Sequence, residues 1–328
     1  MIFLSKTPYR ISFFGGGSDY PFWYDKYGGE VISTTINKYN YIYLRENLNF
    51  INYKYKIVYS KVEYLNSLKK IKHRAVREIL KYYKIDRPLE IHYDGDLPAR
   101  SGVGSSSAFV VGLVKIMESL ESKKKFIDNN KVAKLAIHLE RNVMKEIVGS
   151  QDQVATAVGG FNIISFYKNE KYKIQKINKN KYLNRLDNNL FLVYTNIQRT
   201  AQDVAKSFIN KLTTTKKKNI KNILKLVSEA KTIIRKQQLD EFGLLLNKSW
   251  EEKKELSKSI SNLTIDAIYD KAIKCGAIGG KILGAGGGGF FLFYVPKEKH
   301  KFFLKNIKPL NVIPFKFDYN GTKLSLMD

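Results

Sequence analysis

A run of small residues that opens directly into an apolar segment most constrains this chain. It reads LPARSGVGSSSAFVVGL and occupies residues 97–113. The apolar residues after the serines have helical spacing, so a helix is expected over 105–119. Backbone N–H groups converge at a helix N-terminus, and the helix dipole adds partial positive charge there. The sequence therefore predicts an anion-binding loop at the start of this helix.

Two further glycine clusters occur, RISFFGGGSDY at 10–20 and KILGAGGGGFF at 281–291. Each could be an ordinary turn, but three clusters in one chain favour a reason such as close backbone approach to a ligand. The P-loop pattern G-x-x-x-x-G-K-[ST] is absent from the sequence. The third cluster contains G-x-G-x-x-G, but the strand-like FFLFYV follows it, where a dinucleotide-binding fold needs a helix.

Two carboxylates stand in KLAIHLERNVMKEIVGSQDQ, which comes after the first loop in the chain. Glu140 falls on a helix expected over 131–147, and Asp152 follows Gly149, which suggests a helix end or a turn. Phosphoryl transfer to a hydroxyl needs Mg²⁺ and often a carboxylate that takes the hydroxyl proton. A hard cation takes oxygen ligands, which Glu140 and Ser106 could supply if the two helices pack side by side. Both carboxylates could instead be surface charges.

The chain is strongly basic, with 57 Lys and Arg residues against 30 Asp and Glu residues and a net charge of +27. Lysine is spread over almost every segment, and no nucleic-acid-binding motif accompanies the charge. We therefore expect no nucleic-acid partner. A positive surface favours phosphorylated substrates.

Three features indicate the cellular setting. The single cysteine, Cys275, cannot form an internal disulfide. No apolar run approaches the eighteen residues of a membrane span. The first residues, MIFLSKTPYRISFF, lack the basic leader and long apolar core of a signal peptide. A soluble cytoplasmic protein with no membrane partner is expected.

The pattern of elements favours two α+β domains. Strand patterns dominate the first hundred residues, and later strands and helices are interspersed without the regular alternation of a doubly wound sheet. Further helices are expected at 67–83, 201–212, 216–236, 239–257 and 263–275. A stretch rich in lysine and asparagine at about 168–189 is the expected boundary, so we expect domains at 1–175 and 190–328.

The three motifs together resemble those of the galactokinase, homoserine, mevalonate and phosphomevalonate (GHMP) kinases. LPARSGVGSSSA resembles the family's phosphate loop, P-x-x-x-G-L-G-S-S-A-A, with Val103 at the usual leucine and Ser107 at a usual alanine. TPYRISFFGGGSDY and KILGAGGGGFFLF are similar to the family's first and third motifs, and all three stand in family order. The resemblance implies a two-domain α+β fold that binds ATP and its substrate in the cleft between the domains.

The resemblance also implies roles for individual residues. Asp152 matches the carboxylate proposed as the catalytic base, and Arg10 matches the arginine that would steady the developing charge beside it. Ser106 and Glu140 match the ligands of Mg²⁺. The backbone that would wrap the ATP phosphates belongs to the loop residues Gly102, Val103, Gly104, Ser105, Ser106 and Ser107.

Substrate identity depends on the first motif. Galactokinases carry G-E-H-x-D-Y there, whereas this chain has GGGSDY, with Gly16 and Gly17 replacing the glutamate and the histidine. The motif instead resembles the heptose 7-phosphate kinase subgroup, which implies ATP-dependent phosphorylation of D-glycero-D-manno-heptose 7-phosphate at C1, for nucleotide-activated heptose. The residues expected to contact the substrate are Gly17, Ser18, Asp19, Gly286, Gly287 and Arg199. The candidates for the 7-phosphate are Arg100, Arg141 and Arg199.

Two alternatives stay open. The chain could be another sugar kinase of the fucose or galactose type, or a non-catalytic relative that binds sugar or ATP. The joint presence of Asp152, Glu140 and Ser106 argues against a non-catalytic relative, which has no need of all three. A homodimer is possible.

Overall fold

The structure is a computed structural model that describes residues 1–47, 52–198 and 201–327. Within these residues the larger of two sheets has nine strands in the order β13-β1-β2-β5-β3-β4, with β6 and β12 also paired to β2 and β7 paired to β6. Its strands are β1 (Ile2–Phe14), β2 (Gly29–Glu46), β3 (Tyr55–Val58), β4 (Val62–Leu65), β5 (Leu89–Gly95), β6 (Phe161–Tyr167), β7 (Lys171–Ile177), β12 (Phe317–Asp318) and β13 (Lys323–Met327).

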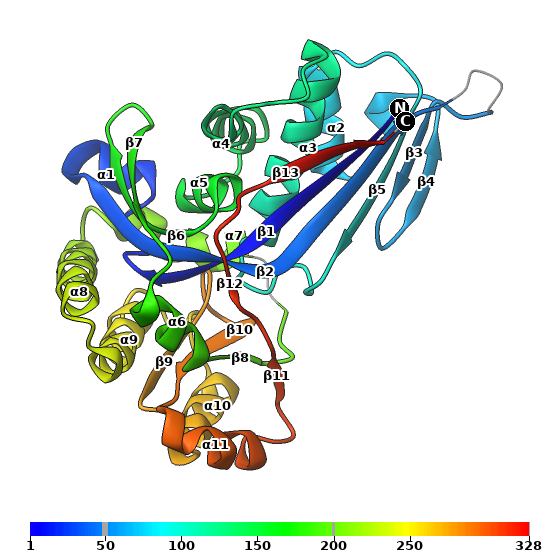
Figure 1. Cartoon of the computed structure of the whole chain (residues 1–328). Coiled ribbons are helices and arrows are strands. Elements are labelled where there is room, and N and C mark those ends of the chain that lie inside the picture. The colour runs from blue at the N-terminus through cyan, green and yellow to red at the C-terminus, as the bar shows by residue number, and fades with distance from the viewer. Residues whose placement is uncertain (48–51, 199–200, 328) are drawn as a thin grey trace.

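The smaller sheet has four antiparallel strands among the described residues, in the order β11-β8-β10-β9. They are β8 (Leu190–Tyr194), β9 (Gly279–Ile282), β10 (Phe290–Tyr294) and β11 (Asn311–Ile313). Every residue of β10 is buried, because apolar residues fill both faces of this central strand. In Figure 1 the helices α10 (Leu263–Lys274) and α11 (His300–Asn306) lie below this sheet.

One group of helices covers the upper face of the large sheet in Figure 1. It comprises α2 (Arg74–Tyr82), α3 (Ser105–Ser122), α4 (Asn129–His138) and α5 (Gln151–Val158). The helix α3 packs on β1 and β2, and it is buried over most of its length because apolar or small residues occur all round it. The same packing places the start of α3, which carries the small-residue loop, against β1.

Two long helices connect the sheets, α8 (Lys217–Lys236) and α9 (Leu239–Lys254). The helix α8 packs on β1 and β2, whereas α9 packs on β9, β10 and β1. The remaining elements are short: α1 (Pro21–Tyr27), α6 (Lys181–Asn188), α7 (Ala201–Lys206), the 3₁₀ turns η1 (Leu68–Lys70), η3 (Ile209–Lys211) and η4 (Lys297–Lys299), and the π-helical segment η2 (Leu139–Val143).

The α+β class is confirmed, with differences at several predicted boundaries. The helix expected over 131–147 ends as α4 at His138 and passes into η2, and Asp152 lies in the first turn of the next helix, α5. The helix expected over 67–83 begins only at Arg74, and that over 201–212 is divided between α7 and η3.

The chain returns to its starting sheet at its end. Strand β13 pairs antiparallel with β1, with Ile2 opposite Met327, so the two ends of the chain lie side by side (Figure 1). The polar stretch 168–189 holds β7 and α6. The division into domains 1–175 and 190–328 stays a prediction. The pairing of β12 with β2 and of β13 with β1 shows that these two strands of the second predicted domain belong to the first sheet. Of the helices described, none combines the length and the apolar character that a membrane crossing requires.

Candidate active site

The three glycine clusters meet at one cleft, a cavity of about 950 Å³. The first cluster contributes Gly16 and Gly17, and the small-residue loop contributes Gly102 and Gly104. The third cluster contributes Gly284, Gly286 and Gly288. These segments lie far apart in the sequence, and α3, β1 and β9 bring them together. The glycines therefore allow three loops to approach the same cleft closely.

The small-residue loop has the geometry that its sequence predicts. Gly102 and Gly104 adopt left-handed backbone angles, with φ values of 85° and 75°, and Gly104 is the N-cap of α3. A Cβ atom on Gly104 would lie 3.1 Å from Cγ of Arg10, so glycine leaves room for the arginine to cross the loop. The serines 105–107 line the cleft at the start of α3, whereas the Val103 side chain is buried in the core.

Arg10 and Asp152 form a two-point ion pair in the cleft. The guanidinium Nε donates to Oδ1 of Asp152 at 2.7 Å, and Nη2 donates to Oδ2 at 2.7 Å. The third nitrogen, Nη1, donates to the backbone oxygen of Gly102 at 2.6 Å. Strand β1 thus fixes, through one side chain, both the carboxylate on α5 and the small-residue loop.

Asp19 lies beside this pair and is buried. Its Oδ1 accepts from the backbone N–H of Gly17 at 3.0 Å, and Oδ2 accepts from that of Gln151 at 3.4 Å. Burial, with the charge of Asp152 as the second cause, raises the pKa of the Asp19 carboxyl to about 6. A Cβ on Gly149 would lie 1.9 Å from Oδ2 of Asp19, so this glycine is needed where the turn before α5 meets the carboxylate.

Glu140 is hydrogen-bonded by Ser107, the neighbour of the serine that the sequence predicts as its fellow Mg²⁺ ligand. Ser107 Oγ lies 3.1 Å from both carboxylate oxygens of Glu140, and Gln153 donates to the same carboxylate. Ser106 is exposed in the cleft. Successive residues of α3 point about 100° apart, and the packing of η2 turns Ser107 toward the carboxylate. The assignment of Ser106 and Glu140 as Mg²⁺ ligands stays a prediction. Burial raises the pKa of the Glu140 carboxyl to about 8.

The remaining predicted substrate residues are only partly brought together. Gly17, Asp19 and Gly286 line the cleft. The Ser18 hydroxyl is used internally, since it donates to the backbone oxygen of Gly15 at 2.8 Å. Gly287 is buried, and its N–H donates to the backbone oxygen of Ile260 at 2.8 Å.

Of the three arginines predicted to bind the substrate's phosphate, one is found in the cleft. Arg100 lines the cleft. Arg141 instead donates to Tyr24 Oη at 2.8 Å and pairs with Glu170 at 3.1 Å, away from the described lining. Arg199 lies outside the described residues.

Two sets of lining residues were missed by the sequence analysis. One is a cluster of rings: the His73 ring centroid lies 5.0 Å from that of Tyr59 and 4.8 Å from that of Phe109, which lies 4.9 Å from that of Tyr93. The other is a pair of lysines, Lys253 and Lys281. Nothing in the sequence pattern marks the rings, and the only signal for either lysine is that Lys281 opens the third glycine motif.

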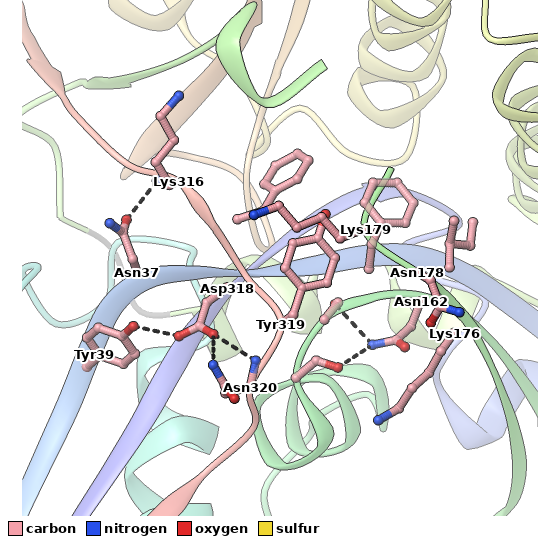
Figure 2. A pocket seen from close by; sticks show the side chains of 15 residues that line it. Asn37, Tyr39, Asn162, Lys176, Asn178, Lys179, Lys316, Asp318, Tyr319 and Asn320 are labelled. Carbon is pink, nitrogen blue, oxygen red and sulfur yellow. Dashed lines mark hydrogen bonds between the residues drawn. The ribbon is translucent and has the colours of Figure 1, made fainter. Parts of the chain in front are cut away.

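A second cavity, of about 730 Å³, shares none of its described lining residues with this cleft. Figure 2 shows it from close by. It is bordered by β2, β6, the end of β7 and the segment around β12. Some of its polar groups bond to one another: Asp318 accepts from Tyr39 Oη at 2.5 Å and from the backbone N–H of Asn320 at 2.7 Å. None of the predicted site residues lines it.

Comparison with known proteins gives the same family as the motifs. Residues 67–160 match the model of the GHMP kinases N terminal domain, and residues 226–306 match the model of the GHMP kinases C terminal region. A D-glycero-alpha-D-manno-heptose 7-phosphate kinase from Campylobacter jejuni is 32% identical in an alignment that covers 97% of each chain.

Two more distant similarities agree with it. A mevalonate kinase from Methanocaldococcus jannaschii is 28% identical over 73% of this chain and 72% of its own. Among solved structures, a D-glycero-D-manno-heptose 1-phosphate kinase from Bacteroides thetaiotaomicron superposes with a TM-score of 0.78 at 25% identity, covering 99% of both chains.

Proposed function

Because the chain belongs to the GHMP kinase family and is therefore a phosphotransferase acting on an alcohol group, we propose that it phosphorylates C1 of D-glycero-D-manno-heptose 7-phosphate with ATP. The observation that carries the reaction type is the meeting of the anion-binding loop with the Arg10–Asp152 pair in one cleft. The observation that supports the substrate is the similarity, over almost the whole chain, to the heptose 7-phosphate kinase of Campylobacter jejuni.

Two parts of the cleft lining are assigned to ATP. We assign the phosphates to the backbone of Gly102–Ser107, where the N-terminus of α3 favours negative charge. The ring cluster of Tyr59, His73 and Phe109 lines the same cleft and offers apolar faces for the adenine base. Burial lowers the pKa of His73, which favours the neutral ring in such a contact.

The residues present fit the Mg²⁺ that accompanies ATP. Glu140 is a fully buried carboxylate with no cationic partner among the described side chains. Burial raises its pKa to about 8, and a bound cation would favour the ionised form again. We assign the metal to Glu140 and to Ser106, the hydroxyl exposed in the cleft, while Ser107 and Gln153 orient the carboxylate. When bound, Mg²⁺ neutralises charge on the transferring phosphates.

Asp152 is the proposed acceptor of the proton of the substrate hydroxyl. The Arg10 clamp holds the carboxylate in one orientation, and each carboxylate oxygen keeps a lone-pair site for the hydroxyl. The hydroxyl oxygen then attacks the γ-phosphorus as the bond from phosphorus to the bridging oxygen of ADP breaks. Arg10 stays beside the reacting groups and offsets the negative charge that spreads over the phosphoryl oxygens.

Sugar binding is assigned to the end of the cleft lined by the first glycine cluster. Asp19 is fixed by two backbone N–H groups and can still accept sugar hydroxyls. Gly16 and Gly17 leave this end without the glutamate and histidine side chains of galactokinases. The extra room suits a seven-carbon sugar better than it suits galactose.

Release of ADP across a panel of acceptors tests the assignment. The panel contains heptose 7-phosphate, free heptose, galactose, fucose and mevalonate, each with ATP and Mg²⁺, and ³¹P NMR of the product identifies the phosphorylated carbon. Turnover of heptose 7-phosphate to a 1,7-bisphosphate is expected. Turnover only with fucose or galactose would show that the heptose assignment is wrong. Binding of ATP without turnover on any acceptor would favour the non-catalytic alternative.

A further inference from the structure

Two lysines from the second half of the chain reach the cleft beside Arg10. Lys281, on β9, is buried and donates from Nζ to the backbone oxygen of Phe13 at 2.6 Å and to Ser249 Oγ at 3.2 Å. Lys253, near the end of α9, donates from Nζ to the backbone oxygens of Ile282 at 2.8 Å and Gly284 at 2.6 Å. Both ammonium groups are therefore held in fixed positions by neutral oxygen atoms.

The charge of these lysines is not balanced by the protein. Among the side chains that the structure describes, neither ammonium has a carboxylate within the 4.0 Å of a salt bridge. The catalytic carboxylate proposed above, Asp152, already accepts two hydrogen bonds from Arg10. Buried charges are normally paired, because an unpaired one loses its hydration without compensation. Arg10 is thus paired with Asp152, whereas Lys253 and Lys281 are held by neutral oxygen atoms and have no counter-charge of their own in the part of the chain that the structure describes.

The anchors of the lysines place this unbalanced charge at the reacting region. Gly284, whose backbone oxygen holds Lys253, packs on the phosphate loop so closely that a Cβ on it would lie 2.6 Å from Cα of Gly102. Phe13, whose backbone oxygen holds Lys281, stands on β1 three residues after Arg10. The two ammonium groups are thus tied to the two segments between which a phosphoryl group would move.

On the basis of the kinase function proposed above, we propose that Lys253 and Lys281 form, with Arg10, a seat for a phosphoryl anion in the cleft. The anion is a phosphate group with free oxygens, and two sources of it are compatible with the chemistry. One is the γ-phosphoryl group of ATP, and the other is the phosphate already carried by the sugar. The proximity of Gly284 to the phosphate loop favours the γ-phosphoryl group.

Binding measurements on variants separate the two sources. Lys253→Met and Lys281→Met remove a charge each, and Lys254→Met is the matched control, since the neighbouring Lys254 instead pairs with Glu251 at 3.0 Å. For each protein the affinities for ADP, AMP-PNP, heptose 7-phosphate and free heptose are measured with Mg²⁺ present. For the γ-phosphoryl source, the affinity for AMP-PNP falls about tenfold or more while that for ADP is unchanged. For the sugar source, the affinity for heptose 7-phosphate falls and that for free heptose is unchanged.

Proton uptake gives a second readout that a purely structural lysine would not change. Burial, with Arg10 as the second cause, lowers the pKa of Lys281 to about 7, so an anion beside it raises that pKa again and a proton is taken up. Calorimetry at pH 7 in buffers of different ionisation enthalpy should show this uptake when AMP-PNP binds and its loss in Lys281→Met.

Controls distinguish a variant that fails to fold from one that lacks the anion site, and both from a wrong sugar substrate. The melting temperature of each ligand-free variant is measured, and Lys253→Gln and Lys281→Gln replace any methionine variant that fails to fold. Equal affinities of variant and wild type for all four ligands, or an equal loss for all four, would overturn the anion seat. Because AMP-PNP and ADP are compared without turnover, a wrong sugar substrate leaves this test intact.

Discussion

The guanidinium of Arg10 grips both carboxylate oxygens of Asp152, with each contact at 2.7 Å. Both residues line the cleft, and the arginine side chain is 4% exposed whereas that of Asp152 is 25% exposed, so the carboxylate is the more accessible partner. Such a two-point pair holds the carboxylate in one orientation before the substrate arrives. The pair couples β1 to the first turn of α5, and both segments must be folded for it to exist.

Replacement of Asp152 by asparagine tests its proposed role in proton transfer. We expect Asp152→Asn to lower kcat by about 100-fold to 10,000-fold, the range typical of a lost general base. The affinity for ADP should be unchanged, because the phosphate loop is untouched. Steady-state kinetics and ADP titration measure the two quantities, and a kcat equal to that of the wild type would remove Asp152 from the chemistry.

Replacement of Arg10 tests the clamp itself. Arg10→Lys keeps the charge but cannot bind two carboxylate oxygens and the Gly102 backbone oxygen together. We expect kcat to fall about tenfold or more in Arg10→Lys and further in Arg10→Met. If the lysine variant works as well as the wild type, a point charge suffices and the two-point geometry has no catalytic value.

The metal assignment is tested by titration with Mg²⁺. Glu140→Gln removes the anionic ligand and should raise the Mg²⁺ concentration at half-maximal rate most strongly. Ser106→Ala should raise it because a ligand is lost, and Ser107→Ala because the carboxylate loses an orienting hydroxyl. An effect of Ser107→Ala with none of Ser106→Ala would make Ser107 the ligand.

Glu140 should also make the stability of the ligand-free protein depend on pH. Its pKa is raised to about 8 in the folded chain, so the folded state holds a proton that the unfolded state has lost between pH 4.5 and 8. Stability therefore falls as pH rises through this window, by on the order of 1 kcal/mol per pH unit for one proton. Glu140→Gln should flatten that slope.

Urea denaturation of both proteins at pH 6, 7 and 8 measures this difference. Asp19, whose pKa is raised to about 6, titrates mainly below the range, so the difference between the two proteins isolates Glu140. Parallel pH profiles for the wild type and Glu140→Gln would show that the carboxylate is not protonated in the folded chain.

Gly149 offers a test of the sugar end of the cleft. A Cβ there would lie 1.9 Å from Oδ2 of Asp19, so Gly149→Ala must displace the carboxylate. We expect a higher KM for the sugar and an unchanged KM for ATP, since Asp19 and the phosphate loop are separate parts of the site. An unchanged sugar KM would show that Asp19 serves only to fix the turn before α5.

The features that the sequence predicted well are those set by neighbouring residues. The helices α8 and α9 follow from apolar spacing, and the loop at 102–107 follows from small residues at a helix start. The third cluster was correctly separated from a dinucleotide motif, because the strand β10 follows it. Each of these depends on local backbone preferences and on which face of an element is apolar.

The features that the sequence did not predict depend on contacts between distant segments. The choice of Ser107 over Ser106 as the partner of Glu140 depends on how α3 rotates against η2. The significance of Lys253 and Lys281 was hidden among 57 basic residues, since only packing shows which ammonium groups lack a counter-charge.

The sequence by itself determined the family, the α+β class and the three loops that meet at the cleft, because backbone conformation at glycines and helix starts is specified locally. The tertiary structure alone decided which side chains face one another across the cleft and which strands complete the first sheet. The return of β13 to β1 joins residues more than 300 positions apart, and the same long-range packing fixes the burial and charge environment of each group in the site.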